Sequence, residues 1–159
     1  MWVALLRNAI DMVQRAVQRR VSPRSIVSPS IFEVPLRYGR VRFMPDHVES
    51  REDGTEVLQR LRTGRISSSE KDKNIYALYQ RAARSGPQHR EVEIVSLSTN
   101  AVEAVCLREP TIVSRLARYD EAVLGILAGR FPPQPNEREC PRCPHFFICP
   151  SAEADATDR

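Results

Sequence analysis

Three cysteines near the C-terminal end are the residues best placed to bind a metal. The stretch "CPRCPHFFICP" arranges Cys140, Cys143 and Cys149 as C-x2-C-x5-C. A C-x2-C pair brings two thiolates to one metal from a single tight turn, and this spacing is typical of zinc and iron–sulfur sites. A fourth ligand is needed, and the sequence offers His145 or Cys106. Cys106 also fits a buried strand residue, because isolated cysteines commonly pack as small hydrophobic side chains, and a loop without metal is the alternative for the trio.

The arginine-rich stretch "EVLQRLRTGR" is a second candidate site, because it has the pattern of a strand followed by a turn. Strand alternation places Arg60 and Arg62 on one face, and Arg65 follows in the turn. Arginine binds phosphate through its planar guanidinium group, but its pKa is too high for it to act as a general base. These arginines therefore either contact backbone phosphate or pair internally with Asp46 and Glu49.

Arginine is also concentrated at the beginning of the chain, whose formal net charge is +4. Apolar residues recur at helical spacing over residues 1–20, which predicts an amphipathic helix with arginines on its solvent side. Arg15 and Arg19 on this helix are candidate contacts for a phosphate-bearing partner such as nucleic acid, and a solvated polar face is the alternative. The apolar face of the helix requires a partner surface.

The elements that must position these residues follow from periodicity and turn signals. A proline- and serine-rich linker at residues 21–30 separates the first helix from the rest. We then expect two strands around Tyr38-Gly39 and a third strand within 52–62, which follows an Asp53-Gly54 turn. A helix at 70–85 comes next, then strands at 91–98 and 101–108 joined near Thr99-Asn100, and a helix at 111–129. This order predicts an α/β fold with a single mixed sheet of about five strands flanked by helices and followed by a cysteine-rich loop. The domain spans residues 31–150, and residues 151–159 form a flexible tail.

Length and composition exclude several classes of protein. The chain has 159 residues, 42% of them hydrophobic and 28% charged, which fits one soluble globular domain. No run of roughly 18 apolar residues is present, so no membrane span is expected. Arg7 and Asp11 interrupt the first apolar segment, which argues against a secretory signal. We therefore expect a cytoplasmic protein whose cysteines are thiols or metal ligands rather than disulfides.

The order of these motifs resembles the RecB-like branch of the PD-(D/E)XK nuclease superfamily, which includes Cas4-like nucleases and the nuclease domains of bacterial DNA-repair helicases. The resemblance covers roughly residues 31–150 and rests on "PDHVE", "EDG", "RLRTGR", "IYALY", "GRFPPQP" and "CPRCPHFFICP" in that order. It implies a restriction-endonuclease-like core, DNA as partner, association with a helicase domain or subunit, and a 4Fe-4S cluster on the cysteine loop, for which zinc is the alternative.

The chain departs from this family at the catalytic positions. Asp46 and Tyr79 match the family's catalytic residues, but Arg60 stands where its aspartate belongs and Arg62 where its lysine belongs. Ile75 occupies the usual glutamine position, and the early histidine and the first cluster cysteine have no counterpart. A hard divalent cation prefers carboxylate oxygens, so magnesium is not expected in such a cationic pocket.

The sequence therefore favours a catalytically inactive, nuclease-like, DNA-binding domain of the repair or recombination machinery. One alternative is an active magnesium-dependent nuclease that combines Asp46 with Glu49 or Glu33 as migrated carboxylates. The other is a zinc-binding interaction module whose N-terminal helix docks on a partner protein.

Overall fold

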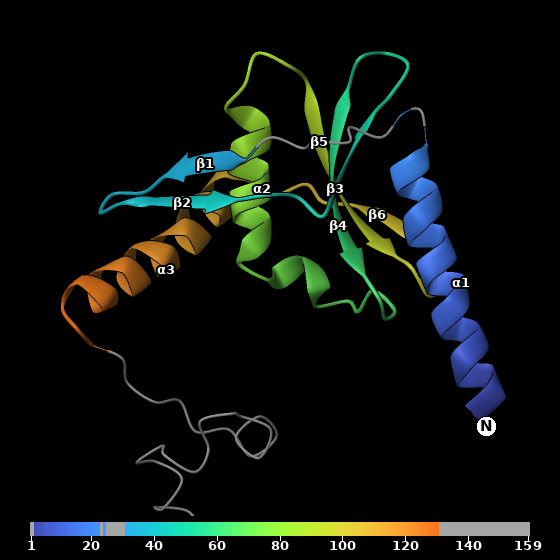
Figure 1. The fold of residues 1–159 in the computed structure, drawn as a ribbon. Coiled ribbons are helices and arrows are strands. Elements are labelled where there is room, and N and C mark those ends of the chain that lie inside the picture. The colour runs from blue at the N-terminus through green and yellow to red at the C-terminus, as the bar shows by residue number, and fades with distance from the viewer. Residues whose placement is uncertain (1, 23, 25–30, 131–159) are drawn as a thin grey trace, which may run out of the picture. The chain divides into compact units, whose positions relative to one another are not determined.

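The computed structural model describes residues 2–22, 24 and 31–130 and has a mixed α/β fold (Figure 1). Its helices are α1 (Trp2–Val21), α2 (Ile75–Arg84) and α3 (Glu109–Leu127), with a short 3-10 helix, η1, at Glu70–Asp72. Its strands are β1 (Phe32–Pro35), β2 (Arg40–Phe43), β3 (His47–Ser50), β4 (Glu56–Arg62), β5 (Arg90–Ser96) and β6 (Val102–Ala104). No helix in these ranges has the length and apolar character needed to cross a membrane.

The strands form two sheets rather than the single sheet that the sequence predicted. The described residues contain a two-stranded sheet, β1-β2, and a four-stranded sheet in the order β3-β4-β5-β6. The division falls at Pro45, whose buried side chain separates β2 from β3. Proline cannot donate a backbone hydrogen bond to a neighbouring strand, so the segment that looked like one strand becomes two.

The four-stranded sheet is mixed, with one parallel pair at its centre. β3 runs antiparallel to β4, and β5 runs antiparallel to β6, but β4 and β5 are parallel with Leu58 opposite Val92. Gly54 (φ +83°) closes the turn between β3 and β4, and Asn100 (φ 56°) closes the turn between β5 and β6. Both turns were predicted, because these two residue types accept the left-handed conformation. The parallel pair requires a crossover connection, and α2 supplies it.

Helix α2 forms the centre of the core. Seven of its ten residues are buried, so it is covered on more than one side. Tyr76 and Tyr79 pack with Leu58 and Ile94 of the four-stranded sheet. Other residues of α2 belong to a second cluster with the β1-β2 sheet and α3, made of Val34, Ala77, Leu78, Ala82, Ile112 and Leu116.

Helix α1 has the expected length, but its orientation differs from the prediction. Arg15 and Arg19 point toward the β5–β6 turn, where they make hydrogen bonds. The apolar side chains of Leu6 and Val13 are instead 63% and 62% exposed. The arginines are on the side of α1 that meets the β5–β6 turn, because backbone carbonyls and the Asn100 side chain accept hydrogen bonds from them there.

The chain divides into two compact units, Met1–Val123 and Leu124–Arg159. All the strands and the greater part of the helices belong to the first unit. In the second unit, the end of α3 is followed by Gly129 (φ +63°), and the amide of Arg130 donates to the carbonyl of Gly125 at 2.8 Å. This left-handed glycine ends the helix where the sequence predicted.

Candidate nucleic-acid interface

Asp46, the candidate catalytic carboxylate, lies directly before β3 and is held by β4. Its Oδ2 atom accepts a hydrogen bond of 2.9 Å from the amide of Leu61 and lies 3.8 Å from Nη1 of Arg60. The side chains of Asp46 and Arg60 are 35% and 28% exposed. One oxygen of the carboxylate is thus occupied by protein donors, and its charge is matched by a guanidinium group.

Arg62 is matched in the same way by Glu70, the first residue of η1. The Nε atom of Arg62 lies 3.4 Å from Oε1 of Glu70, whose side chain is only 5% exposed. Lys73 Nζ and the hydroxyl of Tyr76 donate to the same carboxylate at 2.7 and 2.8 Å. Burial alone would raise the pKa of Glu70, but the hydrogen bonds from Lys73 and Tyr76 and the charge of Arg62 lower it overall. Glu70 is therefore ionised at neutral pH.

Tyr79 lies near the Asp46–Arg60 ion pair, on the side of the sheet that α2 covers. The residue is 1% exposed, and its hydroxyl has no hydrogen-bond partner among the described residues. Burial raises the pKa of Tyr79, and the nearby charge of Asp46 raises it further, while Arg60 opposes both effects. The hydroxyl is therefore neutral and lies near Arg60.

The ion pairs of this site do not suit a divalent cation, because both carboxylates already face positive side chains. Asp46 is paired with Arg60 and Glu70 with Arg62. The described part of the chain contains no group of three or more histidine, cysteine, aspartate or glutamate side chains that could hold a metal ion. The carboxylates proposed to have migrated lie elsewhere. Glu49 accepts from Gln59, and Glu33 pairs with Arg40 in the two-stranded sheet.

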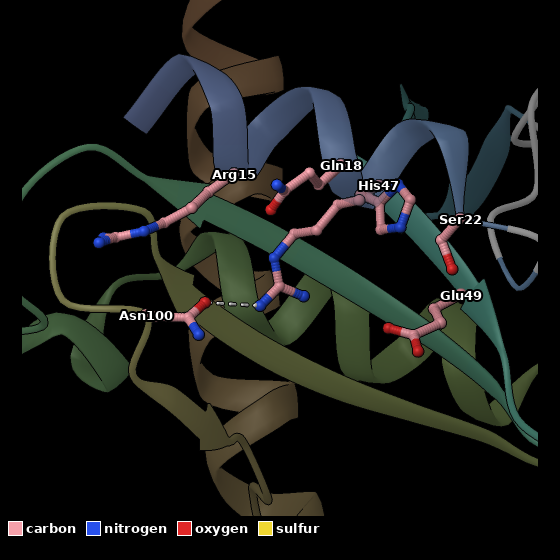
Figure 2. Close-up of a pocket in the computed structure, with 7 residues that line it drawn as sticks. Arg15, Gln18, Ser22, His47, Glu49 and Asn100 are labelled. Carbon is pink, nitrogen blue, oxygen red and sulfur yellow. Dashed lines mark hydrogen bonds between the residues drawn. The ribbon is translucent and has the colours of Figure 1, made fainter. Parts of the chain in front are cut away.

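Arg15 and Arg19 are not brought together with Arg60 and Arg62. They line a polar pocket of about 400 Å³ together with His47 (Figure 2). His47 is opposite Gln59 in the β3-β4 pair, so it lies on the face of the sheet away from Arg60. Nη1 of Arg15 donates to the carbonyls of Leu97 at 2.5 Å and Ser98 at 2.7 Å, and Nη2 of Arg19 donates to Oδ1 of Asn100 at 3.3 Å. These two arginines therefore join α1 to the sheet.

The same pocket keeps its histidine neutral. Burial lowers the pKa of His47, the charges of Arg19 and Arg20 lower it further, and Glu49 opposes them. Figure 2 shows His47 beneath α1, between the helix and the sheet. The described residues that line the pocket thus include arginines from α1 and one carboxylate, Glu49, from β3, and those from the sheet carry no positive charge.

Arg65 is exposed in the turn after β4 and forms no ion pair with any described residue. It therefore differs from Arg60 and Arg62, whose charges are matched.

The sequence did not identify Glu70 and Lys73 as part of this site. Their signal is the spacing of Glu70 and Lys73, which are oppositely charged and three residues apart at the predicted helix start.

Four residues of the cysteine-rich loop, Cys140, Cys143, His145 and Cys149, lie outside the described residues, as does the tail at 151–159. The remaining candidate ligand, Cys106, is a free thiol and is exposed. The prediction that it is buried in a strand is wrong, because β6 ends at Ala104 and the inward position is taken by Val105, which is 4% exposed.

Comparisons with known proteins give no family assignment. No family model matches the chain, and no curated protein matches it. A solved structure with a similar arrangement is the crystal structure of SSO0001, which is 17% identical in sequence. The alignment covers 94% of this chain and 71% of that chain, with a TM-score of 0.49. At this level the likeness supports no conclusion about function.

The paired Glu70 carboxylate should make stability depend on pH. Because its pKa is lowered in the folded state, the ionised group stabilises the fold above its ordinary value of 4.5, and this contribution disappears as pH falls through the folded pKa. We expect Glu70→Gln to reduce the free energy of unfolding at neutral pH by roughly 1–3 kcal/mol. The difference from the parent should shrink in acid, as measured by urea unfolding across the acid range.

The matched control is Glu52→Gln. Glu52 also pairs with an arginine, Arg24, but its side chain is 85% exposed, so its replacement should change stability little at any pH. An equal loss for Glu70→Gln at neutral and acid pH would mean that the charge of Glu70 is not the source of its effect.

Proposed function

We propose that this chain is a catalytically inactive, nuclease-like domain that binds the DNA backbone through the end of β4. The observation that carries the proposal is that Arg60 and Arg62 occupy the strand beside Asp46, where each faces a carboxylate that would otherwise be available to a metal. We place the domain in the cytoplasmic DNA-repair or recombination machinery, with a helicase domain or subunit as its partner.

The order of the elements supports the nuclease-like part of this proposal. In the resembled family, a strand that carries an aspartate is followed by a hairpin and the catalytic strand, then by a helix, two strands and a second helix. β3, β4, α2, β5, β6 and α3 follow one another in this order. The central parallel pair β4-β5, with α2 as crossover, is compatible with a restriction-endonuclease-like core.

The charges favour binding over cleavage. Cleavage by this class of enzyme needs carboxylate oxygens for a divalent cation and a group that can take a proton from water. Arg60 and Arg62 can supply neither, because a guanidinium group has no acceptor and does not lose its proton near neutral pH. Asp46 is in addition hydrogen-bonded to the amide of Leu61.

Donors for phosphate are present at the same place. Arg62 is 37% exposed and meets Glu70 through Nε, and no described residue accepts from its two terminal amino groups. Arg65 is exposed three residues further along the chain, and Lys73 contributes an ammonium group on a side chain that is 49% exposed. Guanidinium groups bind phosphate oxygens in a bidentate manner, so this cluster suits a nucleic-acid backbone.

We further propose that Cys140, Cys143 and Cys149 hold an iron–sulfur cluster of the 4Fe-4S type, with zinc as the alternative. The support is their C-x2-C-x5-C spacing, whose thiolates are suitable ligands for either metal. The exposed thiol of Cys106 is available as a fourth ligand, and His145 is the other candidate.

Binding to DNA should weaken with salt and depend on the β4 arginines. Each phosphate contact contributes a slope of about −0.9 to the dependence of log affinity on log salt concentration. We expect the double variant Arg62→Gln with Arg65→Gln to make the slope of log affinity against log salt concentration less steep by roughly 2. The parent should show little preference for DNA sequence. Fluorescence-anisotropy titrations of mixed-sequence single-stranded and duplex DNA measure both. Arg37→Gln, in the exposed β1–β2 turn, is the control. Absence of binding at low salt would refute the proposal.

The parent protein should show no magnesium- or manganese-dependent cleavage of labelled DNA. Arg60→Asp alone should not restore cleavage, because the guanidinium group of Arg62 remains beside the new carboxylate. Arg62→Lys alone should not restore it either, because the metal ligand at position 60 is still missing. The double variant rebuilds the Asp-x-Lys strand beside Asp46, so weak manganese-dependent cleavage is expected there. Parent activity that disappears in Asp46→Ala would instead identify an active nuclease with migrated carboxylates.

Replacing a cluster ligand should release metal and destabilise the fold, because metal binding by such loops is coupled to folding. We expect Cys143→Ser to lower the melting temperature and to lose the visible iron–sulfur absorbance of the parent. Cys106→Ser tests the fourth ligand by the same two measurements. A colourless parent with one equivalent of zinc would favour the zinc alternative, and a parent without metal would contradict both.

A further inference from the structure

Helix α1 carries a continuous apolar seam that the described part of the chain leaves uncovered. The seam residues are separated by intervals of three, four, three and four positions, and their exposed fractions lie between 48% and 72%. They are Val3, Leu6, Ile10, Val13 and Val17. Alternating intervals of three and four are the a and d positions of a heptad repeat, the pattern by which one helix packs along another.

The protein's own domain meets α1 on the opposite side. Arg15, Arg19 and Ser22 line the pocket above β3, and Arg15 and Arg19 bond to the β5–β6 turn (Figure 2). With Val3 and Ile10 as a positions, Arg15 and Ser22 fall at f, the outermost position of a coiled coil. Contact with the sheet therefore turns the seam outward instead of covering it.

We propose that this seam pairs with the same seam of a second copy, as an antiparallel two-helix coiled coil. The regular heptad spacing suits a partner helix of the same repeat. The flanking e and g positions include Arg7, Gln14, Ala9 and Ala16. Arg7 is the only charge among these four, so this set gives no like-charge repulsion when e faces e in the antiparallel pair.

The charge at the end of the helix decides the orientation. Arg20 occupies the next d position, and Arg19 and Arg20 are the basic residues of the last turn. A parallel pair would place the two Arg20 side chains against each other in the seam. An antiparallel pair places Arg20 opposite Val3 of the second copy, Leu6 opposite Val17, and Ile10 opposite Val13. The two Arg20 residues are then separated by roughly 25 Å along the helix axis, and the helix dipoles oppose favourably.

The proposal is independent of DNA binding and of the cysteine loop, and the oligomeric state of the full chain tests it. Sedimentation equilibrium over a roughly hundredfold range of concentration should give a monomer–dimer equilibrium. The double variant Ile10→Gln with Val13→Gln should raise the dimer dissociation constant at least about tenfold. Ala4→Gln, an exposed position of the same helix outside the seam, should leave the constant unchanged.

The orientation is tested with a spin label attached through a clickable unnatural residue at Val21, which avoids the native cysteines. The antiparallel pair predicts two labels separated by roughly 28 Å along the axis, because residues 2 and 21 of the two copies are then neighbours. A parallel pair would bring the labels to about the 8–10 Å spacing of packed helices and would refute the orientation.

Three results would overturn the proposed dimer. The first is a parent that is monomeric at every concentration. If the seam variant then melts at a lower temperature than Ala4→Gln, the chain itself covers the seam. A monomeric parent that co-sediments with anionic phosphatidylserine vesicles would identify a lipid surface as the occupant. A dimer that persists unchanged in the seam variant would place the contact elsewhere.

Discussion

The burial of α2 is the constraint on which the rest of the first unit depends. Strands β4 and β5 can be parallel neighbours only if a crossover segment returns the chain, and that segment must cover the sheet it crosses. Tyr76 and Tyr79 fill this role against β4 and β5, while Ala77 and Leu78 take part in the second apolar cluster. Glu70 lies in η1, directly before α2, and Arg60 and Arg62 lie on β4. The positions of these charged side chains therefore depend on the same core.

Charge neutralisation is the second organising feature. A buried carboxylate such as Glu70 is tolerated because an arginine, a lysine and a tyrosine hydroxyl satisfy it. The same pairing removes the oxygens that a cation would use. The donors of Arg62 and Arg65 that are not engaged by described residues are the reason why we propose a polyanionic backbone as the ligand.

Much of the element order could be predicted from local signals, since Gly54, Asn100 and Gly129 mark the turns and the helix end where the structure has them. The separation into two sheets could not, because the effect of Pro45 depends on which strand lies next to it. The pairing of Arg62 with Glu70 also escaped prediction, because their contact depends on where β4 ends relative to η1. The orientation of α1 was predicted in reverse, because periodicity locates an apolar face but does not say which surface meets it.

The attachment of α1 has a consequence for how the molecule opens. The hydrogen bonds from Arg15 and Arg19 to the β5–β6 turn are polar and only partly shielded from solvent, whereas α2 is enclosed by apolar side chains. Detaching α1 breaks these contacts and leaves the core of α2 intact, so its local opening free energy lies below that of global unfolding. In native-state hydrogen exchange of the monomer, we therefore expect the amides of α1 to belong to a separate, less protected foldon than those of α2.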